Sequence, residues 1–180
     1  MGDWKAPTPR TLPSPIVTGY WNKEILVLGC GNVLFGDDGF GPAVAGYLEQ
    51  SCEVPSHVGV VNAGSAVRDL LFTVALNERR PRLIIIVDAV DDGMPPGEVR
   101  ERDISEFREV AIGDSSMHLF PTTRLLRELS DLRGIEVKVI SVQVLHAPHE
   151  VRPGLSDVVQ ASIPAVCERI LALLRTAPTT

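Results

Sequence analysis

Apolar residues recur along the chain in two patterns, short continuous runs and stripes at helical spacing. Continuous runs are typical of strands that are covered on both faces of a sheet. They predict strands at 25–28, 58–61, 83–87 and 137–144. Apolar residues repeating three and four positions apart predict helices. These helices are expected at 42–50, 67–75, 121–132 and 156–174. Ser65 is expected to cap the second helix, and Pro164 to cause a kink or a local break in the last one.

Strands and helices alternate in this pattern, which predicts the α/β class, with a mostly parallel, twisted sheet that has helices on both of its faces. A short edge strand is also expected at 98–101, where Val99 is the one apolar residue. Four prolines before residue 16 predict a flexible N-terminal arm over 1–22. A single domain is then expected over 23–175, followed by a tail at 176–180.

Composition narrows the classes of function. The chain has 180 residues, is 44% hydrophobic and carries a net charge of −6, which argues against a nucleic-acid partner. No apolar run approaches the ~20 residues of a membrane helix, and the N-terminus lacks an apolar signal core. The three cysteines are far apart and odd in number, so they indicate no disulfide framework. A reducing, cytoplasmic location without a membrane is therefore expected.

A glycine-rich loop with two acids separates the first predicted strand from the first predicted helix. Five glycines fall within residues 29–41, and Asp37 and Asp38 lie among them. A dinucleotide fingerprint would need glycine where Leu34 stands, and a P-loop would need lysine at the position of Asp37. A tight turn with a solvated acidic tip is the simplest interpretation. The doubled acid at the end of a strand favours a cation site instead.

Two further residues are candidates for the same site. Asp88 directly follows the predicted strand 83–87, and a right-handed crossover would bring the end of that strand beside the end of strand 25–28. Asp38 and Asp88 would then face one crevice, although Asp88 could equally be a turn residue. His118 lies in a polar loop before a helix. Two carboxylates and an imidazole suit a divalent ion such as nickel or zinc, with ligand positions left open.

Other chemistry has weaker support. His146 and His149 are three residues apart after a strand, but a loop does not fix the geometry of a metal-binding pair. The motifs of zinc proteases and of serine hydrolases are absent from the sequence. Cys30 is flanked by glycines and could be a nucleophile, yet a small buried thiol is the simpler interpretation.

Four segments, in order, resemble the motifs of the nickel–iron hydrogenase maturation endopeptidases. They are the loop 29–41, the strand end 85–90, the histidine segment 115–118 and the helix start 154–156. The resemblance covers about residues 24–174 and implies a three-layer α/β/α fold with a five-stranded sheet. The amino-acid sequence at 37–42 and 114–118 is most similar to that of the branch that serves coenzyme F420-reducing hydrogenases. Asp38 departs from many members, which have the longer Glu at that position.

The resemblance also implies a reaction. Members of the family remove a short C-terminal extension from the hydrogenase large-subunit precursor after nickel has been inserted. Catalysis and metal recognition carry over to Asp38, Asp88 and His118, and Asp37 is expected to support the loop. Nickel is expected to arrive with the precursor, and zinc or cadmium could replace it in crystals. The oligomeric state stays open. The alternatives are a non-catalytic chaperone that checks the precursor for nickel, or a Rossmann-like nucleotide-binding enzyme.

Overall fold

The computed structural model describes residues 20–107, 119–146 and 150–176. Residues 1–19 of the predicted arm, His118, His149 and the last four residues lie outside this part of the chain. Within the described residues, no helix has both the length and the apolar character that crossing a membrane requires.

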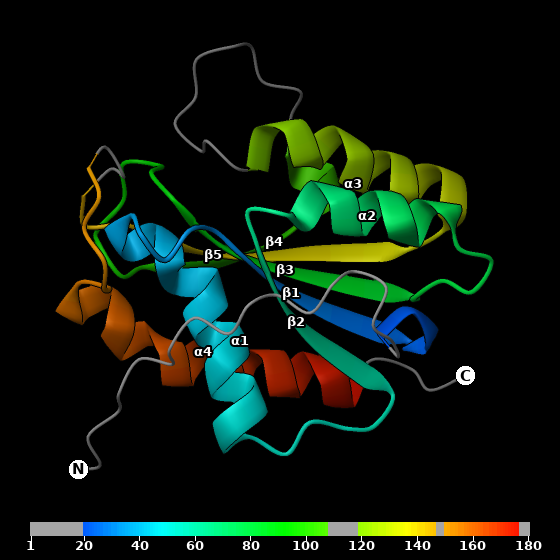
Figure 1. The fold of residues 1–180 in the computed structure, drawn as a ribbon, viewed down its shortest axis with the longest axis horizontal. Helices are drawn as coiled ribbons and strands as arrows, with labels where there is room; N and C mark the ends of the chain where they lie inside the picture. Colours follow the sequence, from blue (N-terminus) through cyan, green and yellow to red (C-terminus); the bar gives the residue numbers. More distant parts are fainter. Residues whose placement is uncertain (1–19, 108–118, 147–149, 177–180) are drawn as a thin grey trace.

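A five-stranded sheet forms the middle layer of the fold (Figure 1). The order of the strands across the sheet is β2-β1-β3-β5-β4, and every neighbouring pair is parallel except β4 with β5. The mostly parallel sheet and the edge strand that the sequence predicts are therefore confirmed. The strands are β1 (Ile25–Cys30), β2 (Val58–Gly64), β3 (Leu83–Val90), β4 (Val99–Asp103) and β5 (Glu136–Gln143).

Helices cover both faces of the sheet, which confirms the three-layer α/β/α arrangement. Helices α1 and α4 pack on one face, and α2 and α3 lie together on the other (Figure 1). The helices are α1 (Phe40–Ser51), α2 (Val67–Leu76), α3 (Leu119–Arg133) and α4 (Asp157–Thr176). Short 3-10 turns occur at η1 (Tyr20–Asn22), η2 (Gly36–Gly39) and η3 (Ile104–Glu106).

The central strands are apolar throughout because each contributes to two separate cores. In β1, Ile25 and Val27 point into the core beneath α1 and α4, whereas Leu26 and Leu28 point into the core beneath α2 and α3. All four side chains are almost completely buried. Alternation of side chains across a strand thus divides one continuous apolar run between the two faces.

The structure corrects three local expectations. Strand β3 continues to Val90, so Asp88 lies within the strand and pairs with Ser141 of β5 rather than starting a loop. Helix α2 begins after Ala66, and no side chain caps it, so the capping role expected for Ser65 is wrong. Helix α4 runs without a break through Pro164, where an interruption was one of the expectations.

Candidate active site

Close backbone packing brings the start of α1 against the ends of β1 and β3. A Cβ atom on Gly41 would overlap the backbone of Cys30 and the carbonyl oxygen of Val87. A Cβ atom on Gly31, whose φ is +118°, would overlap the carbonyl oxygen of Asp38. Glycine at these two positions therefore allows the acidic turn η2 to fold back over the carboxyl edge of the sheet.

Asp37 joins η2 to segments that follow it by more than a hundred residues. Its Oδ2 accepts hydrogen bonds from the backbone N–H of Leu145, at 2.8 Å, and from the hydroxyl of Ser156, at 3.0 Å. Its Oδ1 accepts a third from the backbone N–H of Ser156, at 2.6 Å. The Asp37 side chain is buried, and its contacts agree with the supporting role predicted for it.

Asp38 and Asp88 lie at the same edge of the sheet, and both are buried. The Oδ2 atom of Asp38 accepts a hydrogen bond from the backbone N–H of Asn32 at 2.7 Å. The Oδ1 atom of Asp88 accepts one from the N–H of Ala89 at 2.9 Å. Both carboxylates were expected in loops, but Asp88 belongs to β3 and Asp38 to a 3-10 turn.

The thiol of Cys30 lies close enough to both carboxylates to be affected by their charges. Complete burial raises the pKa of Cys30 well above its usual value, and the negative charges of Asp88 and Asp38 raise it further. Both carboxylates therefore lie within electrostatic reach of one sulfur atom. The raised pKa keeps the thiol protonated, which supports the small buried thiol and opposes the nucleophile considered from the sequence.

The third predicted site residue cannot be placed, because His118 lies outside the described residues. Among the residues that the structure does describe, no group of three or more His, Cys, Asp and Glu side chains has an arrangement able to hold a metal ion. His146 is exposed, and His149 is outside the described part. The structure thus brings Asp38 and Asp88 together, and the complete ligand set stays a prediction.

Gln143 also shapes this edge, and sequence reasoning missed it. Its buried amide donates to Asp91 Oδ1 at 2.9 Å and accepts from the backbone N–H groups of Asp92 and Met94, at 2.9 and 3.2 Å. It therefore organises the loop that follows Asp88 and β3. A single glutamine at the end of a strand matches no motif, so only its position opposite this loop reveals the role.

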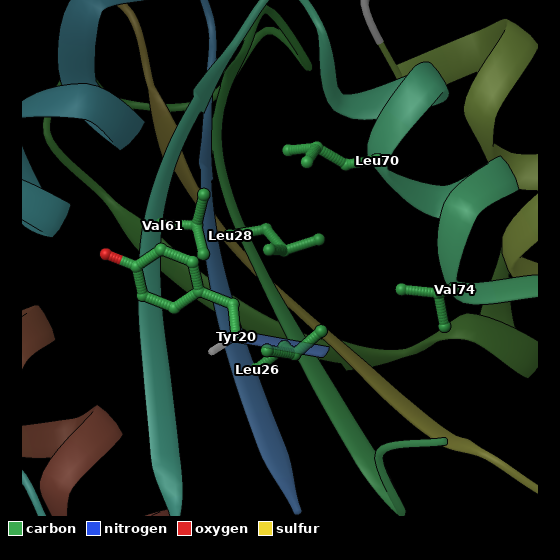
Figure 2. A pocket seen from close by; sticks show the side chains of 6 residues that line it. All are labelled: Tyr20, Leu26, Leu28, Val61, Leu70 and Val74. Carbon is green, nitrogen blue, oxygen red and sulfur yellow. The ribbon is translucent and has the colours of Figure 1, made fainter. Parts of the chain in front are cut away.

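A small apolar pocket lies on the α2 side of the sheet. Figure 2 shows the side chains that line it, which come from η1, β1, β2 and α2. They are Tyr20, Leu26, Leu28, Val61, Leu70 and Val74. Apart from the Tyr20 hydroxyl this lining is apolar, so the pocket offers no carboxylate or imidazole for acid–base chemistry or for a metal ion.

The fold and the acidic edge define a class of protein, in which a three-layer α/β/α domain presents buried carboxylates at the carboxyl ends of parallel strands. Ligands of open α/β sheets bind at this edge. Comparison with known proteins then identifies the family. The family model described as hydrogenase maturation protease matches residues 42–173. The chain belongs to the hydrogenase maturation protease family, and the endopeptidase class predicted for it is confirmed.

Individual relatives agree with this assignment. A putative hydrogenase maturation protease of Methanocaldococcus jannaschii is 35% identical over 154 residues, covering 85% of this chain and 97% of the relative. The coenzyme F420 hydrogenase subunit delta of Methanothermobacter thermautotrophicus is 34% identical, covering 84% and 94%. The structure of the hydrogenase maturating endopeptidase HybD from E. coli aligns with a TM-score of 0.71 at 28% identity, covering 84% and 92%. Assignment to the F420 branch itself stays a prediction.

Proposed function

We propose that this protein removes the C-terminal extension of a nickel–iron hydrogenase large-subunit precursor after nickel has been inserted. Membership of the hydrogenase maturation protease family supports the reaction class. The observation that carries the proposal is the pair of buried carboxylates, Asp38 and Asp88, at the carboxyl edge of the sheet. The proposal includes a cytoplasmic location and His118 as the third ligand.

Nickel is part of the substrate in this scheme, because the precursor brings it to the site. Carboxylate oxygens are suitable ligands for a divalent ion, and Asp38 and Asp88 supply them from two different elements. A nickel ion near the scissile bond supplies Lewis-acid chemistry at the carbonyl group. A carboxylate could instead serve as the general base that activates water. Zinc or cadmium could take the place of nickel in crystals.

The chain's own contribution is to hold the two carboxylates in place. The N–H of Asn32 orients the carboxylate of Asp38, and the N–H of Ala89 orients that of Asp88. The first donor follows the end of β1 and the second belongs to β3, so the carboxylates are positioned before the precursor binds. Such preorganisation reduces the cost of ordering the site during the reaction.

The proposal is tested by intact-mass spectrometry of the nickel-loaded precursor after incubation with the protein. We expect the wild-type protein to shorten the precursor, and Asp38→Asn and Asp88→Asn to leave it at full length. Asparagine is preferred to alanine because each side chain is buried and accepts a backbone hydrogen bond. Circular dichroism of both variants controls for folding.

The outcomes separate the alternatives. A stable complex without any change of mass would favour the nickel-checking chaperone. Wild-type processing by folded Asp38→Asn and Asp88→Asn variants would show that these carboxylates do not form the site.

A further inference from the structure

The loop that leads into η2 and the segment before α4 are joined by their backbones. The N–H of Gly36 donates to the carbonyl of Arg152 at 2.7 Å, and the N–H of Arg152 donates to the carbonyl of Leu34 at 2.8 Å. Phe35 and Arg152 thereby form an isolated parallel bridge outside the main sheet. The turn that carries Asp38 is thus tied to the segment between β5 and α4.

The buried side chain of Asp37 joins the same two segments. Its two carboxylate oxygens receive three donors, and all three come from the segment between β5 and the start of α4. Its neighbour Asp38 lies one residue further along η2. A shift of Leu145 or of Ser156 would therefore displace the turn that presents Asp38.

Three donors on two oxygens require a carboxylate at this position. In an Asp37→Asn variant one acceptor oxygen would become an NH₂ group facing a backbone or hydroxyl donor. The backbone N–H groups of Leu145 and Ser156 occupy different oxygens, so either orientation of the amide breaks one of these two bonds. Asparagine keeps the size of the side chain and removes the function.

We propose that Asp37 is a positioning residue that clamps Leu145 and Ser156 to η2 and so holds Asp38 at the acidic site. It does not contact the substrate, because it is buried and both of its oxygens are engaged by this chain. The inference rests on the proposed function for its catalytic consequence. The clamp itself can be measured without any substrate.

The first measurement is amide hydrogen exchange in the full-length protein. In Asp37→Asn we expect the amide of Leu145 or Ser156 to exchange at least about tenfold faster than in the wild type, while the amides of β3 keep their wild-type rates. Unchanged exchange at both amides in the folded variant would overturn the proposal. The exchange measurement tests the clamp even if the wild-type protein cleaves no precursor. That outcome would refute the proposed function alone.

The second measurement separates kcat from KM for processing of the nickel-loaded precursor. We expect Asp37→Asn to lower kcat at least about tenfold, because small displacements of a catalytic group have large effects on rate, while KM stays within about twofold. Glu24→Gln is the matched control, since Glu24 pairs with Arg82 at the opposite edge of the sheet and should leave kcat unchanged. Wild-type kcat in folded Asp37→Asn, or an equal loss of kcat in Glu24→Gln, would overturn the proposal.

Ser156→Ala provides a graded second variant that keeps the negative charge. It removes the hydroxyl donor at 3.0 Å and retains both backbone bonds to Asp37. We expect a loss of kcat of about two- to fivefold, smaller than that of Asp37→Asn. If Asp37→Asn does not fold, Ser156→Ala decides the matter, and an unchanged kcat would then overturn the clamp.

Discussion

Replacing Gly41 with alanine tests whether close backbone packing builds the site. The added Cβ atom would overlap the backbone N and O atoms of Cys30 and the carbonyl oxygen of Val87. All three distances are well below 3.0 Å, a separation under which Cβ atoms are essentially never found. These atoms belong to β1 and β3, the two adjacent strands that hold Cys30 and Asp88. The start of α1 must therefore move away from the sheet, because the strands cannot yield separately.

The expected cost follows from the rigidity of these neighbours. Inserting a methyl group into a packed interior costs about 1–3 kcal/mol. Because the contacts here are backbone atoms of two paired strands, we place Gly41→Ala at the upper end, about 3 kcal/mol. For a chain of this size that corresponds to a fall in Tm of about 6–12 °C.

Gly39→Ala is the matched control in the same turn. Its Cβ atom would lie 3.1 Å from the Cα atom of Val33, and Gly39 has a φ of −73°, which any residue adopts. We expect its free energy of unfolding to stay within about 1 kcal/mol of the wild type. Urea and thermal unfolding of both variants provide the comparison. Equal stability of Gly41→Ala and Gly39→Ala would refute the packing argument.

Three further predictions concern other parts of the molecule. Leu126→Ala removes a fully buried side chain of α3 and should lower the free energy of unfolding by about 2–5 kcal/mol in urea titrations; a loss below about 1 kcal/mol would contradict its place in the core. Burial raises the pKa of Cys52, and it raises the pKa of Cys167 to about 12. Above pH 9.0 the folded chain therefore keeps thiol protons that the unfolded chain releases, so the stability of the protein should fall as pH rises. Urea midpoints at pH 8 and pH 10.5 test this, and an equal fall in Cys167→Ala would contradict it. Hydrogen bonds from Ser105 lower the pKa of Asp103, so the contribution of Asp103 to stability should be lost as pH falls below 3.8. In acid thermal melts, Asp103→Asn should therefore lose less stability than the wild type, and equal losses would contradict this.

Much of the fold could be predicted because its signals are local. The run 83–87 is buried on both faces of a sheet, and that burial produces a continuous apolar pattern. The end of β3 could not be predicted in this way. Asp88 continues the strand because Ser141 of β5 pairs with it, and a carboxylate inside a strand has no apolar signature. The strand therefore extends as far as its partner does, which a local pattern does not reveal.

The candidate site was likewise predictable only where its features are local in the sequence. Its position after β1 could be predicted from the glycines and acids at 29–41, since a turn and a carboxylate are local features. The donors to Asp37 lie 108 and 119 residues away in the sequence and include backbone N–H groups, which every residue carries. Gln143 is a similar case, because its amide contacts a loop that lies about fifty residues earlier in the chain.

The most direct test of the account is the nickel dependence of precursor processing. Large-subunit precursor is prepared with and without nickel, incubated with the wild-type protein, and measured by intact-mass spectrometry. We predict loss of the C-terminal extension from the nickel-loaded precursor alone, because Asp38 and Asp88 are proposed to recognise the ion that it carries. Equal shortening of the nickel-free precursor would contradict the account.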